Sequence, residues 1–353
     1  MNASLIRGGT AMEYRQLGNT GTRVSKLCLG TMNFGGRTEE DEAHRIIDTA
    51  IDGGMNFIDT ADVYARGVSE EFTGRALQAN GKRDDIVLAT KAVARMGKGP
   101  NDHGASRYHL TRAVEDCLRR LQTDRIDLFY LHITDITTPI EEILDTLNVL
   151  VKQGKILYVG TSKWPVPLIM EALWKADKMG GPQIVAEQPP YNLTDRRAEM
   201  ELVWTAQRYG LALVPFGPLA GGVLSGVYRK DEPIPEGHHF KEVGQRDGHK
   251  RMEPKVLDLV EELIPLAEER GISLAEFSLA WCAQRPGITS PITGPRTVGH
   301  VESALRAVEI ELTEEEMDRV DEIIPPGEAV TDYFTLYKRM CRAVNEDEPL
   351  GPF

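Results

Sequence analysis

The stretch NFIDTADVY at residues 56–64 decides the fold prediction. A short apolar run ends abruptly in Asp59, and a second ionisable side chain, Tyr64, follows five residues later. The apolar run is typical of a buried strand, and the polar residues after it indicate a loop. The stretch therefore predicts a strand whose last side chain is charged, with a tyrosine on the loop above it.

Two further apolar runs end in the same way. Residues 86–90 stop at Lys91, and residues 126–131 stop at His132. If the three runs are neighbouring parallel strands, their last side chains lie at one rim of the sheet. We therefore expect Asp59, Lys91 and His132 to meet there, with Tyr64 on the loop above.

The alternation of apolar runs and helical patterns continues along the chain. Apolar runs begin near Val24, Asn56, Ile86, Ile126, Ile156, Ile184, Leu211 and Ile288. Helices are expected at residues 39–53, 69–79, 106–121, 139–153, 166–178, 196–209, 254–270, 273–285, 298–308 and 313–324. Most of the intervals are about 30 residues, the length of one βαβ unit. Eight such units predict a single-domain (β/α)8 TIM barrel. A doubly wound sheet is the alternative, but the glycine fingerprint GxGxxG of that fold is missing.

The ends and loops of the barrel also have expected limits. Residues 1–12 are expected to be a disordered leader, and residues 13–325 the barrel domain, entered through an N-terminal β-hairpin around the turn at 18–21. Residues 326–353 form a tail that is expected to contribute to the substrate pocket. Long active-site loops are expected at 92–107 and 217–250.

Composition excludes several classes of protein. Lysine and arginine number 41 against 54 acidic residues, a formal net charge of −13, so a basic surface for nucleic acid or anionic membrane is not expected. The four cysteines are scattered and form no CxxC pair, which favours a reducing compartment. No apolar run reaches the roughly 18 residues of a membrane span. We therefore expect a cytoplasmic protein without membrane or nucleic-acid partners.

The four ionisable side chains suit the reduction of a carbonyl group. A tyrosine, with an ordinary pKa of about 10, becomes a better acid when a lysine ammonium lies nearby and favours the phenolate. Asp59 would keep Lys91 charged and oriented, and His132 could donate a hydrogen bond to a substrate oxygen. Together they provide a proton donor and an oxyanion clamp for a hydride that comes from elsewhere.

Each of these residues also has an ordinary structural interpretation. Alone, Asp59 could cap a turn, Tyr64 and Lys91 could be surface residues, and His132 could be a satisfied core histidine. Their placement at equivalent strand ends is what favours a functional site. His238, His239 and His249 fit no ligand spacing for a metal, so we interpret them as a solvated loop and expect no metal site.

An ordered set of motifs resembles the aldo-keto reductases along residues 13–324. The set comprises GGMNFIDTA at 53–61 with Tyr64, Thr90-Lys91, Leu131-His132, Gly160-Thr161-Ser162, Gln188, Tyr191-Asn192, Pro218-Leu219 with the glycines to Gly226, and Gly294-Pro295-Arg296-Thr297. The resemblance implies a barrel that binds NADPH or NADP⁺ without a Rossmann fold and reduces a small-molecule carbonyl, with Tyr64 as general acid and Asp59, Lys91 and His132 as the other catalytic residues.

The resemblance also implies a cofactor site and a substrate pocket. The implied cofactor residues are Gly30, Thr31, Met32, Asp59, Ser162, Lys163, Gln188, Phe216, Gly217, Pro218, Leu219, Gly221, Gly222, Leu224, Gly226, Gly294, Arg296, Thr297 and His300. Among them, Ser162 and Gln188 would bind the nicotinamide carboxamide, and Arg296 and Thr297 the adenosine 2′-phosphate. The substrate pocket would be lined by Tyr64, His132, Trp164 and Tyr191.

Some positions depart from the common family pattern. The pair after the fifth barrel strand is Ser162-Lys163, followed by Trp164, which resembles the long-chain branch that includes the voltage-gated potassium channel β subunits. His300 and Ala304 replace a frequent glutamine and asparagine. Two alternatives therefore stay open: an NADP-binding, redox-sensing regulatory subunit, and a dehydrogenase that oxidises an alcohol or sugar. The branch also contains homo-oligomers.

Overall fold

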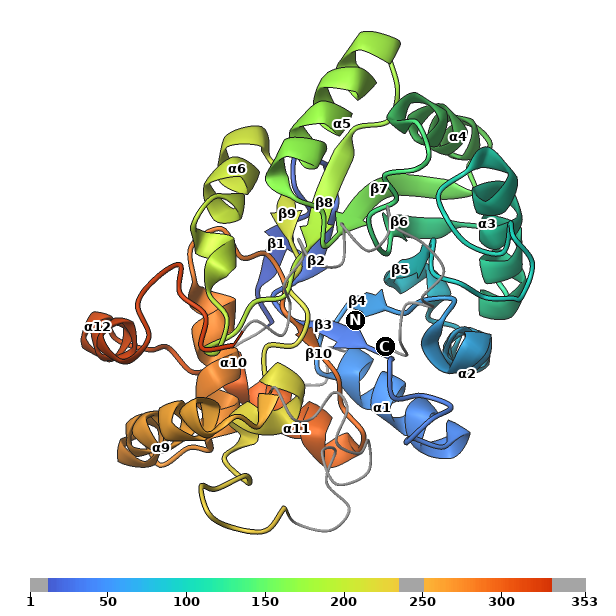
Figure 1. The fold of residues 1–353 in the computed structure, drawn as a ribbon. Helices are drawn as coiled ribbons and strands as arrows, with labels where there is room; N and C mark the ends of the chain where they lie inside the picture. Colours follow the sequence, from blue (N-terminus) through green and yellow to red (C-terminus); the bar gives the residue numbers. More distant parts are fainter. Residues whose placement is uncertain (1–11, 235–250, 332–353) are drawn as a thin grey trace.

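Eight parallel strands form one sheet at the centre of the protein (Figure 1). In this computed structural model, residues 12–234 and 251–331 are described. The strands lie in the order β10-β3-β4-β5-β6-β7-β8-β9. Parallel bridges join Leu213 to Ile288 and Phe216 to Ile292, so the two edges of the sheet meet. The predicted (β/α)8 barrel is confirmed.

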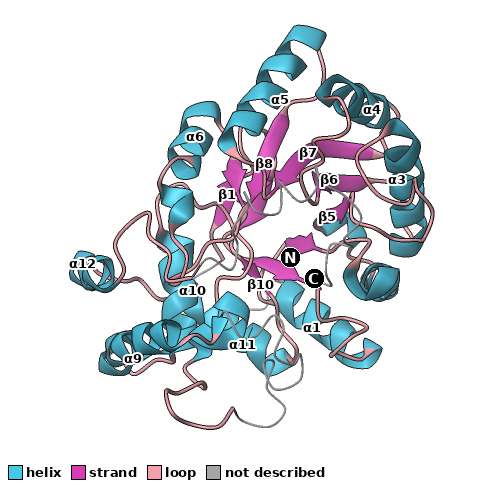
Figure 2. Cartoon of the chain, in the orientation of Figure 1, coloured by secondary structure: helices cyan, strands magenta, loops and turns pink. Residues whose placement is uncertain are grey.

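The barrel strands are short, and helices surround them (Figure 2). The strands are β3 (Cys28–Gly30), β4 (Phe57–Asp59), β5 (Val87–Ala92), β6 (Ile126–Leu131), β7 (Ile156–Ser162), β8 (Ile184–Gln188), β9 (Ala212–Leu213) and β10 (Ile292–Thr293). The helices are α1 (Glu40–Asp52), α2 (Val68–Asn80), α3 (Arg107–Leu121), α4 (Ile140–Lys152), α5 (Val166–Met179), α6 (Leu202–Tyr209), α9 (Pro254–Glu269), α10 (Leu274–Gln284), α11 (Val298–Ala307) and α12 (Glu314–Ile323). Short 3-10 helices are η1 (Tyr64–Gly67), η2 (Arg83–Asp85), η3 (Arg197–Glu199) and η4 (Ala220–Ser225).

The predicted hairpin is present and covers one end of the barrel. Strands β1 (Tyr14–Gln16) and β2 (Arg23–Ser25) pair antiparallel. Leu17 and Val24 are fully buried in the cluster of side chains that fills the barrel interior. The backbone N–H of Asn19 donates to the carbonyl of Gly210, just before β9 begins, at 2.8 Å. The hairpin therefore lies at the N-terminal ends of the strands, and the opposite end carries the site.

Three predicted elements differ from the structure. The run near Val24 belongs to hairpin strand β2, and the first barrel strand begins only at Cys28. Ile288 makes a single bridge, and the last strand begins at Ile292. The pattern at 196–209 is divided into η3 and α6. An apolar run shows that a segment is buried, but hydrogen-bonding partners elsewhere decide which of its residues form the strand.

The start of the predicted tail returns to the loop after β8. Arg196 N–H donates to the carbonyl of Glu328 at 2.8 Å, and Val330 N–H donates to that of Thr194 at 3.0 Å. Residues 1–11, 235–250 and 332–353 lie outside the described parts, so the leader, the limits of the domain and most of the tail stay predictions. Over residues 12–234 and 251–331, none of the helices has the length and hydrophobicity that crossing a bilayer requires.

Gly74 provides a test of how closely α2 packs on α3. A Cβ atom at this position would lie 2.6 Å from the carbonyl carbon and oxygen of Leu121, which are backbone atoms that cannot move aside. We expect Gly74→Ala to lower the free energy of unfolding by about 1–3 kcal/mol in urea titrations. Gly299→Ala, in α11, is the control, because its Cβ would have no neighbour closer than 3.9 Å. Equal stability of the two variants would contradict this packing.

Candidate active site

The alternation of side chains along the strands brings the predicted catalytic residues together. Phe57, Ala89 and Tyr130 belong to the interior cluster of the barrel. Side chains two residues apart in a strand point the same way, so Asp59 and Lys91 also point inward. His132 directly follows β6 and is two residues after Tyr130, so its side chain points inward as well. All three are buried, with exposed fractions of 2%, 0% and 3%.

Lys91 connects the members of this site. Its ammonium forms a buried ion pair with Asp59 and donates to the carbonyl of Thr60 at 2.8 Å and to the hydroxyl of Tyr64 at 3.2 Å. The second oxygen of the Asp59 carboxylate accepts a hydrogen bond from Gln188 Nε2 at 2.8 Å. The rings of Tyr64 and His132 meet edge to face, with centroids 5.7 Å apart. We call Asp59, Tyr64, Lys91 and His132 the tetrad.

Burial controls the protonation states of the tetrad. It raises the pKa of Tyr64 above its ordinary value, and the nearby Lys91 ammonium only partly offsets this rise, so the expected lowering is outweighed. Burial alone would lower the pKa of Lys91, but the Asp59 carboxylate and the Tyr64 hydroxyl bring it above the ordinary value. Burial, with Lys163 and Lys91 nearby, lowers the pKa of His132 well below its usual range. At neutral pH the site therefore contains a phenol, an ammonium and a neutral imidazole.

Two of the implied nicotinamide ligands lie beside the tetrad. Ser162 and Gln188 are paired in register at the ends of β7 and β8, and both are buried. The Ser162 hydroxyl donates to the carbonyl of Gln188 at 3.0 Å, and the Gln188 amide contacts Asp59. Lys163, which follows, has a left-handed φ of 60°, and its ammonium lies 5.7 Å from the centroid of the Phe216 ring. The polar groups at this rim fit an amide-bearing ligand.

The glycine-rich segment after β9 has a backbone that only glycine adopts easily. Gly217, Gly221, Gly222 and Gly226 all have left-handed φ angles between 67° and 100°. A Cβ at Gly217 would meet nothing within 4 Å, so its surface is open, whereas Leu224 is fully buried and anchors the segment. Pro218 and Leu219 lie between the open Gly217 and the buried Leu224. An open backbone of this kind fits close approach by a phosphate.

A third group of implied cofactor residues lies where α11 begins. Thr297 is the N-cap residue, Arg296 is half-buried, and His300 is exposed. The Arg296 N–H donates to His300 Nδ1 at 3.2 Å, and Asn33 Nδ2 donates to the carbonyl of Gly294 at 2.9 Å. A guanidinium beside a helix N-terminus is a suitable donor set for a dianion.

The implied residues at the end of β3 have different surroundings. A Cβ at Gly30 would lie 2.5 Å from Ile292 Cγ2, so glycine permits the close contact of β3 and β10. The hydroxyl of Thr31 is fully buried against that of Ser69, 2.7 Å away. Met32 has an exposed fraction of 54%, which is high for an apolar side chain.

Two of the aromatic residues implied for the substrate pocket, Trp164 and Tyr191, belong to the outer core, between the barrel and its helices. Trp164 is buried, and its backbone N–H donates to a Glu187 oxygen at 3.2 Å. Tyr191 is fully buried, stacks on Trp281 with centroids 5.3 Å apart, and donates its hydroxyl hydrogen bond to Glu199. The structure therefore directs Tyr191 towards Trp281 rather than towards the tetrad.

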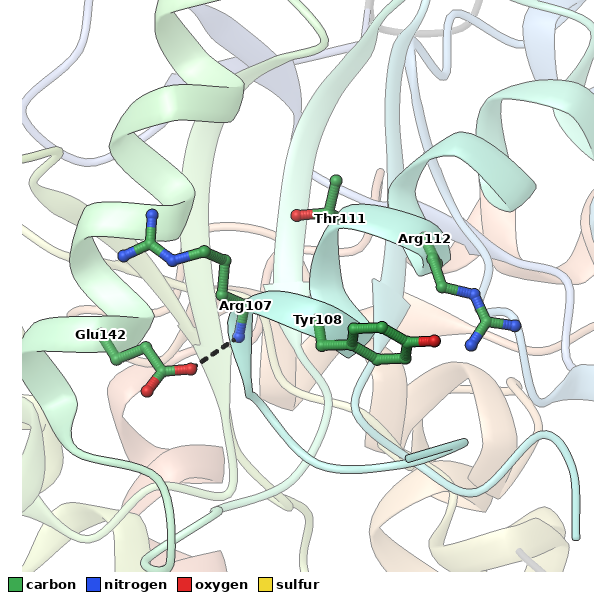
Figure 3. A pocket seen from close by; sticks show the side chains of 5 residues that line it. All are labelled: Arg107, Tyr108, Thr111, Arg112 and Glu142. Carbon is green, nitrogen blue, oxygen red and sulfur yellow. Dashed lines mark hydrogen bonds between the residues drawn. The ribbon is translucent and has the colours of Figure 1, made fainter. Parts of the chain in front are cut away.

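A surface hollow of about 720 Å³ lies over the N-terminal end of α3 (Figure 3). Its lining residues are Arg107, Tyr108, Thr111, Arg112 and Glu142. The backbone N–H of Arg107 donates to Glu142 at 2.9 Å, and the Arg112 guanidinium lies over the Tyr108 ring. None of the tetrad residues lines it, so the hollow is separate from the candidate active site.

Four charged residues near the site were not singled out from the sequence: the buried Asp62, Glu70 and Glu187, and the half-buried Arg120. In the sequence, Glu70 looks like an ordinary acidic residue in the first turn of a helix. Glu187 looks like an isolated polar residue within an apolar strand. The alternation of β8 is a usable signal, because it turns Gln188 inward and Glu187 outward.

For the described residues, no group of three His, Cys, Asp or Glu side chains could hold a metal. His238, His239 and His249 lie outside that part of the chain.

A comparison with protein families assigns this chain to a family. The model of the aldo/keto reductase family matches residues 26–325. The chain belongs to this family. The fold and the family together support an oxidoreductase that acts on small molecules.

Relatives of this aldo/keto reductase carry two kinds of name. One is the "Uncharacterized oxidoreductase YrpG" of Bacillus subtilis, 39% identical over 90% of this chain and 97% of its own length. Two others, from Arabidopsis thaliana and from Oryza sativa subsp. japonica, are each called "Probable voltage-gated potassium channel subunit beta". Both are 36% identical over 89% of this chain and 97% of their own lengths.

Glu187 gives this reductase a testable pH dependence. Burial raises the pKa of its carboxyl to about 7, although hydrogen bonds from Thr161 and from the N–H of Trp164 oppose the rise. From pH 4.5 to 7 the folded protein holds a proton that the unfolded chain has lost, so this group lowers stability as pH rises. We expect Glu187→Gln to gain up to about 3 kcal/mol relative to the parent over that window, measured by urea unfolding. Glu171→Gln, at an exposed carboxyl of α5, is the control, and a constant difference between Glu187→Gln and the parent would refute the assignment.

Proposed function

We propose that this aldo/keto reductase uses NADPH to reduce an aldehyde or ketone to an alcohol. One observation carries the proposal: the hydroxyl of Tyr64 accepts a hydrogen bond from the buried Lys91 ammonium and lies beside a neutral His132. A phenol next to a fixed cation can release its proton at the moment of reaction, because the ammonium stabilises the phenolate that forms.

The described residues fit the cofactor in three places. Ser162 and Gln188 would hold the carboxamide of the nicotinamide, and the open backbone at Gly217 would follow the pyrophosphate. Arg296, with Thr297 and His300, would hold the 2′-phosphate that distinguishes NADPH from NADH. When bound, the cofactor would supply the hydride.

The protein's own residues would supply the proton and orient the carbonyl. Tyr64 keeps its proton at neutral pH because its pKa is raised, so it is available as the acid. His132, kept neutral by burial, would donate an N–H hydrogen bond to the carbonyl oxygen. Asp59 keeps Lys91 charged, so the cation is in place before the phenolate forms. Each reduction would consume one proton, returned to Tyr64 from solvent.

A second candidate function follows from the relatives named as potassium channel β subunits and from the Lys163-Trp164 pair. It is an NADP-binding subunit that senses redox state and regulates a partner. Slow turnover with tight cofactor binding would favour it. A dehydrogenase working on an alcohol or sugar uses the same residues in reverse, and equilibrium cofactor ratios in the cell would decide the direction.

We further propose a cytoplasmic protein whose partners are its cofactor and a small carbonyl compound. The described cysteines, Cys28, Cys117 and Cys282, are buried free thiols, in keeping with a reducing compartment. The formal charge of −13 does not suit nucleic acid. The chain from Glu328 to Val330 lies against the loop after β8, which supports a role for the following tail at the substrate pocket. A homo-oligomer is consistent with the family.

Tyr64→Phe tests the proton donor. The phenyl ring keeps the packing on His132, but the positioned proton donor is lost. We expect kcat to fall by about 10²–10⁴-fold while the dissociation constant for NADPH stays within about twofold. Turnover is followed by the absorbance of the reduced nicotinamide, and binding by intrinsic fluorescence. Tyr108→Phe, at an exposed ring that lines the separate hollow at α3, is the matched control. Full activity of Tyr64→Phe would remove Tyr64 from the mechanism.

Arg296→Ala tests the choice of cofactor. If the guanidinium binds the 2′-phosphate, its loss should weaken NADPH by about 10–100-fold and NADH by less than about twofold. Fluorescence titration with each nucleotide measures both constants, and Arg119→Ala, at an exposed arginine of α3, is the control. Equal losses for both nucleotides would place the 2′-phosphate elsewhere.

A further inference from the structure

The turn that carries Tyr64 has an unusual backbone. Ala65 (φ 46°, ψ 34°) and Arg66 (φ 55°, ψ 41°) are left-handed, and Gly67 follows with φ 96°. Left-handed backbone is energetically unfavourable for a residue with a Cβ atom. Two such residues in succession persist only where the surrounding structure holds them.

Arg120, from α3, lies directly beneath this turn. A Cβ at Gly67 would be 2.6 Å from Arg120 Cδ and 2.9 Å from its Nε, so the turn rests on the arginine side chain. The guanidinium in turn donates from Nε to Glu70 at 2.6 Å. The exposed fractions of the Arg120 and Glu70 side chains are 14% and 0%, so the carboxylate of this ion pair is fully buried and the guanidinium is partly buried.

Glu70 connects the same pair to the strand that carries Lys91. Its second oxygen accepts a hydrogen bond from the Thr90 hydroxyl at 2.5 Å, and Thr90 immediately precedes Lys91 in β5. Because side chains alternate along the strand, Thr90 faces α2 while Lys91 faces the barrel interior. One fully buried carboxylate therefore links the backbone of Lys91 to the support of the Tyr64 turn.

Asp62 is a second buried acidic side chain near Arg120. It is buried, and its N–H donates to the carbonyl of Lys91 at 3.1 Å. Burial raises the pKa of its carboxyl well above the usual range and Glu70 raises it further, whereas Arg120 and Lys91 act against this. Arg120 is thus the cation that faces both buried acids from the α3 side.

We propose that Arg120 and Glu70 are positioning residues for the reaction: their ion pair holds the strained turn so that the Tyr64 hydroxyl stays against Lys91. They touch neither substrate nor cofactor and act only through Tyr64. The inference depends on the proposed function, in which Tyr64 is the acid. It predicts a loss of turnover that is separable from binding and from general destabilisation.

The test is a double-mutant cycle of Arg120→Met with Tyr64→Phe. In the parent, Arg120→Met should lower kcat at least about tenfold and leave the dissociation constant for NADPH within about twofold. In Tyr64→Phe it should change the residual rate less than about twofold, because no hydroxyl remains to be positioned. Arg119→Met is the control, at the neighbouring but exposed arginine paired with Asp116. It should leave kcat and the dissociation constant for NADPH unchanged.

A second variant covers the case in which Arg120→Met does not fold, since it leaves the Glu70 charge buried alone. Glu70→Gln with Arg120→Met removes both charges and should give the same loss of kcat. Parental kcat in either folded variant, or an equal loss in the Tyr64→Phe background, would overturn the positioning role. Parental kcat in Tyr64→Phe itself would instead overturn the proposed function.

Discussion

The buried ion pair between Lys91 and Asp59 is the interaction on which the site depends. Removing an ammonium and a carboxylate from water costs several kcal/mol for each ion, and only good geometry with further hydrogen bonds offsets that cost. Here the carbonyl of Thr60 and the amide of Gln188 complete the coordination of the two charges. The pair therefore requires β4, β5 and β8 to keep their places around the barrel.

The same pair supports the proposed role of Tyr64 as a proton donor. Desolvation alone would make its phenolate very costly, and the fixed ammonium reduces this penalty without taking the proton away. His132 contributes a different property, since burial keeps its ring neutral, so that one ring nitrogen carries an N–H donor and the residue is not a second cation. In the proposed reaction, one ammonium, one phenol and one neutral imidazole would together stabilise the developing alkoxide.

The two ends of the barrel differ in their side chains and backbone. The hairpin covers the N-terminal end of the barrel, where its Leu17 and Val24 side chains join the interior cluster. The opposite end carries the polar rim, the glycine-rich segment and the strained turn after Tyr64. Lys163, where the chain departs from the common family pattern, also has left-handed backbone and contacts Phe216. The left-handed backbone of Ala65, Arg66 and Lys163 therefore lies at the end of the barrel that carries the candidate site.

The sequence by itself determined the barrel, the order of its strands and the convergence of Asp59, Lys91 and His132, because strand alternation is a local property with a period of two. It indicated the N-terminal hairpin as well, but it could not show that the first barrel strand begins only at Cys28, because the limits of that strand depend on hydrogen bonds to β4 and β10, which are distant in the chain. Only the tertiary structure decided that burial outweighs Lys91 in setting the pKa of Tyr64. It also decided that Glu70, an ordinary acidic residue at a helix start, is fully buried between Thr90 and Arg120. Burial and pairing arise from contacts between segments far apart in the chain, and no local pattern records them.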